Sequence, residues 1–144
     1  MIDIAYPPHP YKIKEEGGRE IIFDEIRKQW LVLTPEEWVR QNFIQYLVQA
    51  MQYPATLMAV EKEIQVGGMR RRCDIVVYRD AMPWMIVECK EMKVPLTTTV
   101  LRQVLNYNVR LQVAYLVITN GTTTYAASIS GERAEWITAI PTYK

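Results

Sequence analysis

The chain has 144 residues, of which 49% are hydrophobic and 23% charged, and its formal net charge is +1. These values are typical of one globular domain with a substantial core, and the near-neutral charge argues against a protein that coats nucleic acid. No apolar run reaches the roughly 18–20 residues of a membrane span, and the N-terminus lacks the pattern of a secretory signal, so we expect a cytoplasmic protein without membrane contact.

Residues 1–33 are predicted to form an N-terminal extension that packs on a single domain at 34–144. We expect residues 1–20 to be extended. The segment 20–33 is compatible with two strands or with one short helix, and we favour strands near 21–23 and 29–33. One histidine and two cysteines are too few for a Cys/His zinc site.

The clearest helix of the chain begins at Thr34, which is a good N-cap. Pro35 suits the first helical position, and Glu37 completes a capping box. Apolar residues then recur at helical spacing, at Val39, Phe43, Tyr46, Leu47 and Ala50. Pro54 is expected to end the helix.

The rest of the chain is predicted to alternate strands with one more helix. In order, we expect a strand at 57–66 ended by Gly67-Gly68, a hairpin of Cys73–Tyr78 with Trp84–Cys89, a helix at 97–111, a buried strand at 113–120, an outer strand at 122–130 and a short strand at Trp136–Ile140. This order favours one sheet flanked by helices.

The predicted hairpin carries two acids within nearly apolar runs. Pairing about Ala81 places Asp74 directly across from Glu88, and opposed side chains on one face have Cβ atoms roughly 4.5–5.5 Å apart. Lys90 is expected on the same face as Glu88. Two carboxylates that close repel one another, so a proton, Lys90 or a bound cation must offset the repulsion.

A hard divalent cation suits such a pair, because magnesium prefers oxygen ligands from one or two carboxylates together with water and phosphate. A cation held there can stabilise the negative charge that develops on a phosphodiester. The alternative is a solvated cluster at the end of a hairpin. The runs CDIVVY and WMIVECK favour the functional interpretation, since they are typical of a strand buried on both faces.

The segments TPEEWVRQ, RRRCDIVVY, MIVECK, QVLNY and YLVITNG follow one another between about 34 and 125. This ordered series resembles the PD-(D/E)XK nucleases, and most of all the N-terminal nuclease domain of the motor subunit of type I restriction enzymes. The resemblance implies an α/β (α+β) fold with a restriction-endonuclease-like core, in which a central mixed β-sheet is flanked by helices.

The resemblance also implies roles for single residues. Asp74 and Glu88, with the backbone carbonyl of Cys89, would bind Mg²⁺ or Mn²⁺, and Lys90 would be the catalytic lysine. A glutamate of the first helix often joins the metal site in this fold. Glu37 is our choice, although the capping box explains it without catalysis, and Glu36 is the competing candidate.

Gln103 and Tyr107 match a QxxxY motif of these nucleases and share one helix face. They would turn towards the site or the nucleic-acid backbone, with a plain polar helix side as the alternative. Arg70, Arg71 and Arg72 are candidate nucleic-acid contacts, with a solvated turn as the alternative.

Cys73 and Cys89 are predicted to face each other on the side of the hairpin opposite the acids. In a reducing compartment we expect two buried thiols, and a disulfide is the alternative.

The function that follows is metal-dependent cleavage of DNA. The 144 residues contain no G-x-x-x-x-G-K-[ST] phosphate loop, so we expect cleavage without ATP, or with a partner chain. One alternative is a nuclease-like binding or assembly module with little activity of its own. Another is a nuclease for RNA or for single-stranded or branched DNA. Concerted cleavage of both strands would need a homodimer or a partner subunit.

Overall fold

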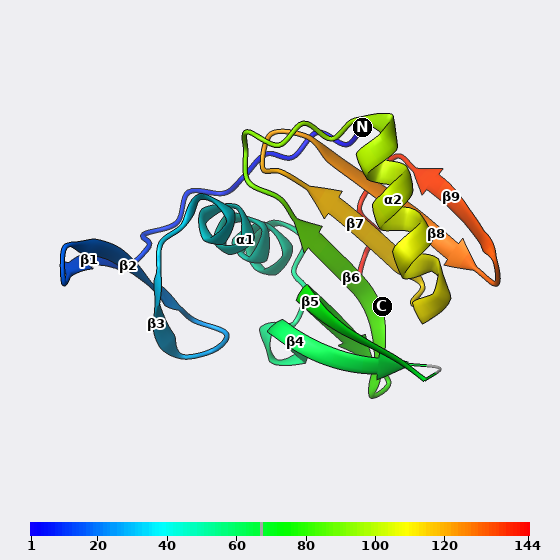
Figure 1. Ribbon diagram of the computed structural model, residues 1–144. Helices are drawn as coiled ribbons and strands as arrows, with labels where there is room; N and C mark the ends of the chain where they lie inside the picture. The colour runs from blue at the N-terminus through cyan, green and yellow to red at the C-terminus, as the bar shows by residue number, and fades with distance from the viewer. Residues whose placement is uncertain (67) are drawn as a thin grey trace.

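A computed structural model describes residues 1–66 and 68–144, so the predicted Gly67-Gly68 turn lies partly outside the described residues. The fold is mixed α/β, as predicted, with a six-stranded mixed sheet, a separate three-stranded sheet and two α-helices (Figure 1). In the described part of the chain, every helix is too short or too polar to cross a membrane.

The six-stranded sheet forms the centre of the domain. Its strands, in spatial order, are β4 (Met58–Val66), β5 (Met69–Arg79), β6 (Met82–Cys89), β7 (Tyr115–Thr119), β8 (Thr124–Ser130) and β9 (Arg133–Ile137). Neighbours are antiparallel except for β6 and β7, which are parallel. A parallel pair needs a crossover, which α2 (Thr98–Asn108) and its final turn Val109–Leu111 provide.

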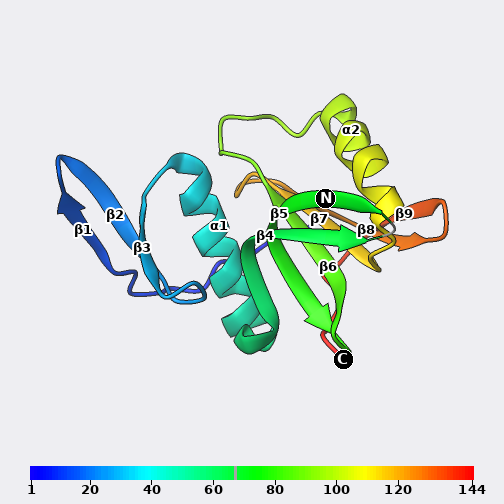
Figure 2. The ribbon, with the colours of Figure 1, turned by 60° about the horizontal axis from the view of Figure 1, so that its bottom comes forward.

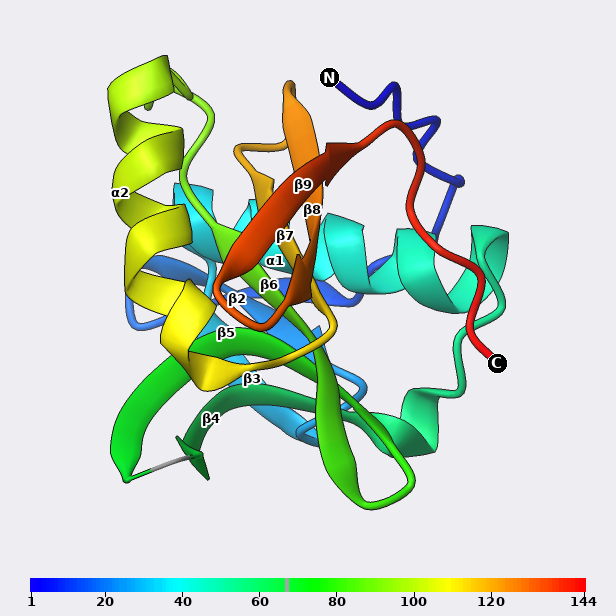
Figure 3. The same ribbon diagram turned by 90° about the vertical axis from the view of Figure 1, so that its right-hand side faces the viewer.

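Two strand predictions near the C-terminus need correction. The strand predicted as an outer one is β8, but β9 pairs with it and takes the edge position. The last strand also begins at Arg133 and not at Trp136. The residues after β9 leave the sheet and pack on the face that α1 covers, where Ile140 is buried and Tyr53 donates a hydrogen bond to the carbonyl of Pro141 (Figure 3).

The two helices cover opposite faces of the six-stranded sheet (Figure 2). Helix α1 (Pro35–Gln45) continues as a π-helical turn (Tyr46–Ala50), and its apolar side forms what we call the α1-face cluster. That cluster contains Val39, Phe43, Ile44 and Leu47 together with Ile75, Val77, Met85, Val87 and Cys89. The α2-face cluster contains Leu101 and Leu111 together with Ile64, Cys73, Val76, Ile86, Leu116 and Ile118.

The N-cap of α1 is confirmed, because Thr34 Oγ1 accepts a hydrogen bond from the Glu37 amide at 3.0 Å. The reciprocal half of the capping box is wrong. The Thr34 amide donates to the carbonyl of Val32 at 3.1 Å, and the Glu37 carboxylate is taken by Arg27, Arg40 and Gln41. A charged partner binds a carboxylate more strongly than an amide does.

The N-terminal segment forms an antiparallel sheet of β1 (Ile13–Glu16), β2 (Arg19–Asp24) and β3 (Gln29–Val32). The predicted strands near 21–23 and 29–33 are therefore confirmed, and β1 is an addition. Helix α1 lies between this sheet and the six-stranded sheet (Figures 1 and 2). The first residues run back to the core, where Ile2 is buried and its amide donates to the carbonyl of Thr124 at 2.8 Å.

Candidate active site

The central hairpin has the predicted register over its middle, with Ile75 opposite Val87 and Val77 opposite Met85. A bulge between Val77 and Tyr78 shifts the pairing near the turn by one residue. At the other end the pairing of β5 with β6 stops at Ile75, so it does not include Asp74, the preceding residue in the sequence. The pairing of β5 with β4 also skips Asp74. Asp74 is therefore free of regular strand pairing.

At this point both β4 and β5 change the face of the sheet to which alternate side chains point. Cys73 belongs to the α2-face cluster and Ile75 to the α1-face cluster, although residues two apart in a strand normally share a face. The register with β4 is the same on both sides, with Lys62 opposite Cys73 and Val60 opposite Ile75. The residue between them on β4, Glu61, has a positive φ of 53°. Such an interruption re-aims a side chain.

The re-aimed Asp74 carboxylate is fully engaged. Its Oδ2 accepts a hydrogen bond from the Cys89 amide at 2.8 Å, which ties it to the end of β6. Its Oδ1 accepts from Arg40 Nη2 at 2.8 Å, and the same nitrogen lies 2.7 Å from Glu61 Oε1. Arg40 also donates to Glu37 at 2.6 Å.

Arg40 is thus the cation that offsets the charge of Asp74. Burial alone would lower the pKa of Arg40, but the hydrogen bond to Asp74 and the charges of Glu37, Asp74 and Glu61 raise it above its ordinary value. The guanidinium stays charged at every working pH. It therefore joins α1 to the carboxylates of β4 and β5 by charge-assisted hydrogen bonds.

Glu88 lies on the other side of the sheet. It is buried, and it accepts a hydrogen bond from Arg71 Nη2. Arg71 Nε in turn donates to Asn108 of α2 at 2.9 Å, and the guanidinium lies 4.3 Å from the ring centroid of Tyr107. Burial raises the pKa of Glu88 to about 7, the charge of Asp74 adds to the rise, and the charge of Arg71 opposes it.

The predicted placement of Asp74 and Glu88 on one face is therefore wrong, because the strand turns over at Asp74. The two side chains instead approach the end of β6 from opposite faces. They are still close enough for the charge of Asp74 to act on Glu88. Each carboxylate has its own arginine partner.

Lys90 lies directly after β6, where its amide donates to the carbonyl of Thr119 at 2.8 Å. Its positive charge lowers the pKa of two acids, Glu36 and Glu88. For Glu36, burial and the charges of Asp74 and Glu61 outweigh Lys90 and raise the pKa above its ordinary value.

These contacts separate the two glutamates of the first helix. The charges of Asp74 and Lys90 both act on the pKa of Glu36. Glu37 is buried, and it binds Arg27 at 3.2 Å and Arg40 at 2.6 Å. The position of Glu37 makes it a support for Arg40.

The QxxxY residues lie on the exposed side of α2, on one face as predicted. Gln103 and Tyr107 line a hollow of about 450 Å³ together with Met69, Asn106 and Arg110. Tyr107 is connected to the carboxylates through Arg71, which stacks on its ring and binds Glu88. For Gln103 the structure gives a place on this hollow and no contact with the acids.

The three consecutive arginines have three different partners. Arg70 is exposed and lies 3.2 Å from Glu63, and Arg72 lies 2.8 Å from Glu61. Arg71 alone turns inward, to Glu88. The sequence offers no signal for this difference except the alternation of a strand.

The two cysteines are free and buried, as predicted. The prediction that they face each other is wrong, since Cys73 belongs to the α2-face cluster and Cys89 to the α1-face cluster. The cause is again the turnover of β5 at Asp74, which moves Cys73 to the other face.

Sequence reasoning missed Arg40 and Asn108. Arg40 stands three and four positions after Glu37 and Glu36, a spacing that places acid and base on one helix face. Asn108 directly follows Tyr107 and is completely buried, with its amide donating to the carbonyl of Val104 at 2.7 Å. A buried asparagine needs such partners, but the sequence does not name them.

The donors at the end of β6 suit a divalent cation in kind. The carboxylates of Asp74, Glu88 and Glu36 and the carbonyl of Cys89 are hard oxygen ligands, which magnesium prefers. Within residues 1–66 and 68–144 no three acidic, cysteine or histidine side chains are gathered as a metal centre. A cation bound there would have to replace Arg40 and Arg71 as the partners of the Asp74 and Glu88 carboxylates.

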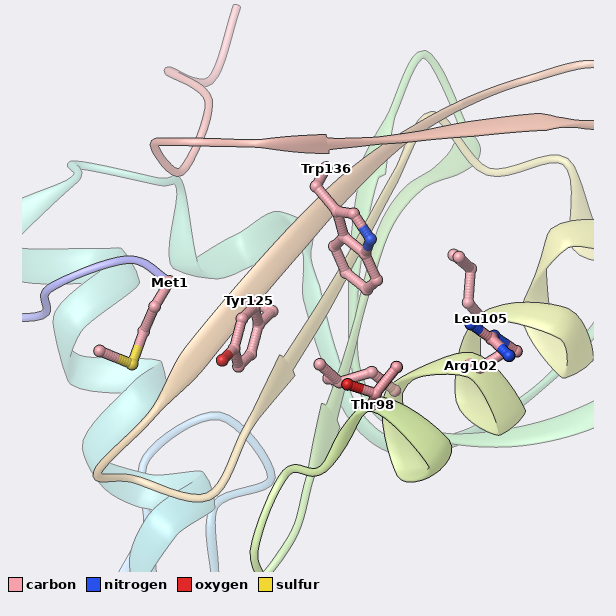
Figure 4. A pocket seen from close by; sticks show the side chains of 7 residues that line it. Met1, Thr98, Arg102, Leu105, Tyr125 and Trp136 are labelled. Atoms are coloured by element: carbon pink, nitrogen blue, oxygen red, sulfur yellow. The ribbon is translucent and has the colours of Figure 1, made fainter.

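Another hollow of the molecule lies away from these residues. It measures about 380 Å³ and opens between α2 and the strands β8 and β9, where Thr98, Arg102 and Leu105 of the helix lie opposite Tyr125 and Trp136 (Figure 4). None of the predicted site residues lines it. This hollow is therefore separate from the candidate site.

The protein-family model of the type I restriction enzyme R protein N terminus matches residues 35–141 of the chain. No curated protein and no solved structure matches the chain. The family match begins at the first residue of α1 and extends beyond β9, so it includes every predicted site residue.

Proposed function

Because the chain belongs to the family of type I restriction enzyme R protein N-termini, we propose that it is a metal-dependent endonuclease that hydrolyses DNA phosphodiester bonds. The observation that carries the proposal is that Asp74 is hydrogen-bonded to the end of β6, the strand that carries Glu88 and leads into Lys90, close enough for the charges of Asp74 and Lys90 to act on Glu88. A buried acid with a raised pKa, such as Glu88, next to charged partners is typical of a catalytic site.

Asp74 and Glu88 would hold Mg²⁺ or Mn²⁺, with the carbonyl of Cys89 as a further ligand. Such a cation would offset negative charge on the phosphodiester and acidify an attacking water. The Cys89 amide holds Asp74 at the end of β6, whereas a cation that binds Glu88 would replace Arg71 as its partner. We choose Glu36 as the first-helix acid that would join them, because the charges of Asp74 and Lys90 act on it.

Lys90 has a separate task. It follows the strand that carries Glu88, and its backbone is fixed to β7 through Thr119. Its ammonium group would hold the scissile phosphate or orient the attacking water. Positioning of this kind contributes by holding the reactants in a near-attack geometry.

Cleavage assays test the proposal. Supercoiled plasmid and single-stranded DNA are incubated with the protein and Mg²⁺ or Mn²⁺, next to the variants Asp74→Ala and Glu88→Ala and the control Glu63→Gln. The proposal expects metal-dependent cutting that both alanine variants lose and the exposed control keeps. Cutting that survives in both alanine variants contradicts it.

One observation favours a second function, a nuclease-like module that binds a partner chain and has little activity of its own. Arg40 and Arg71 bind Asp74 and Glu88, so each of these carboxylates has a positively charged partner without a metal. Under this alternative the protein binds a larger partner whether or not a chelator is present. Pull-downs in EDTA and in Mg²⁺ distinguish the two, since a metal-independent complex without cleavage favours the module.

A further inference from the structure

The three-stranded sheet has an outer face with a half-buried and an exposed aromatic side chain among exposed basic ones. Phe23 of β2 and Trp30 of β3 are directly opposed, and their ring centroids are 5.4 Å apart. Trp30 is 38% exposed. The two rings meet edge to face at 66°, so each offers apolar ring surface to a ligand at its own angle.

Three cations share this face. Lys14 Nζ lies 4.3 Å from the ring centroid of Trp30, and Lys12 Nζ lies 5.4 Å from that of Phe23. Arg19 has the same strand parity as Phe23, so it projects from the same face. All three are exposed. The outer face, as we use the term, consists of Lys12, Lys14, Arg19, Phe23 and Trp30.

The acids of the sheet lie mainly on the opposite face. Glu15 and Glu20 are directly paired there, in line with the buried Ile22 and Asp24. On the outer face the acid is Glu16, which lies 3.7 Å from Lys14. Three cations against one acid give this face a positive charge that the whole-chain value of +1 does not reveal.

The sheet is joined to the candidate active site by a chain of ion pairs. Arg27 binds Asp24 of β2 at 2.7 Å and Glu37 of α1 at 3.2 Å. Glu37 binds Arg40, which binds Asp74. These side chains are mostly buried, so the outer face keeps a fixed position relative to the end of β6.

We propose that the outer face binds single-stranded DNA, with bases stacked on Trp30 and Phe23 and phosphates bound by Lys12, Lys14 and Arg19. Aromatic rings next to a basic track are the recognition mode of single strands, because unpaired bases have free π-faces. A duplex keeps its bases stacked inside and gains little from these rings. The lysines that cover the rings are long and exposed, so they can move to phosphates. The inference rests on the proposed function only for the identity of the ligand as nucleic acid.

Binding is measured by fluorescence anisotropy with a 5′-labelled, mixed-sequence single-stranded deoxyoligonucleotide in EDTA, where no cleavage occurs. Lys14→Glu and Trp30→Ala are each expected to weaken binding about tenfold, since one phosphate contact or one stacked base is lost. Trp30→Phe keeps an aromatic ring and is expected to stay within about threefold of the unmodified protein. Arg133→Glu makes the same charge change on β9, outside the outer face, and is expected to change nothing.

Three results would overturn the proposal: equal affinities for all variants, a loss in Arg133→Glu as large as in Lys14→Glu, or a duplex of the same sequence that binds as tightly as the single strand. Circular dichroism confirms that each variant is folded. The same measurement on Glu88→Ala separates this inference from the proposed function, because binding there should persist even if cleavage is never found.

Discussion

Arg40 and Asp74 form a 2.8 Å hydrogen-bonded ion pair that joins helix α1 to the end of the central sheet. The Arg40 side chain is only 6% exposed, and its guanidinium also binds Glu37 and Glu61. Arg40 therefore supplies the positive charge that offsets the charge of Asp74 next to Glu88.

Arg40→Ala should destabilise the protein by about 3 kcal/mol, because it leaves Asp74, Glu37 and Glu61 without their shared cation in a buried place. Urea unfolding followed by circular dichroism measures the change. Arg70→Ala is the matched control, since Arg70 pairs with Glu63 on the open surface and its loss should cost less than about 1 kcal/mol. Equal losses in the two variants would show that Arg40 does not hold this site together.

The stability of the metal-free protein should depend on Glu88. Burial raises the pKa of Glu88 from 4.5 to about 7 in the folded state. Between these values the folded protein holds a proton that the unfolded chain has released, so the free energy of unfolding falls as pH rises. In EDTA, Glu88→Gln should have a flatter pH profile of stability across this window. Identical profiles would contradict the raised pKa.

Asn108 should matter more than its neighbour Asn106 on the same helix. Asn108 is buried and bonds Arg71 and Val104, whereas Asn106 is exposed. Asn108→Ala leaves Arg71 Nε without its acceptor and should cost about 1–3 kcal/mol of stability. Asn106→Ala should cost less than about 0.5 kcal/mol. Melting curves of both variants test this, and the reverse order would refute the contact with Arg71.

Both cysteines should resist alkylation in the folded protein. Burial raises the pKa of Cys73 to about 12 and that of Cys89 well above its ordinary value, so neither forms the reactive thiolate near neutral pH. Mass spectrometry after iodoacetamide treatment at pH 8 should find no label without denaturant and two labels with it. Rapid labelling of the folded protein, or a disulfide between the two, would contradict their placement on opposite faces.

Several features of the fold can be predicted because they depend on residues close in sequence. The start of α1 follows from Thr34 and Pro35, and the middle of the hairpin follows from two apolar runs around one turn. Strand β1 escapes prediction because all four of its residues are exposed, which leaves no apolar alternation to recognise.

The candidate site is harder to predict, because its geometry depends on residues far apart in the sequence. Asp74 and its partner Arg40 are 34 positions apart. The turnover at Asp74 needs a matching interruption at Glu61 of the neighbouring strand, and neither strand alone indicates it. The family resemblance suggests the acids and Lys90, whereas Arg40, Asn108 and the inward role of Arg71 become visible only in three dimensions.

The most direct test of the central claim is a calorimetric titration of the metal-free protein with Mn²⁺, because absent cleavage could also reflect a missing partner chain. The account predicts a binding site whose affinity falls about tenfold or more in Asp74→Asn and in Glu88→Gln. Glu63→Gln, on the exposed surface of β4, should bind as the unmodified protein does. Unchanged affinity in both site variants would contradict the assignment of Asp74 and Glu88 as metal ligands.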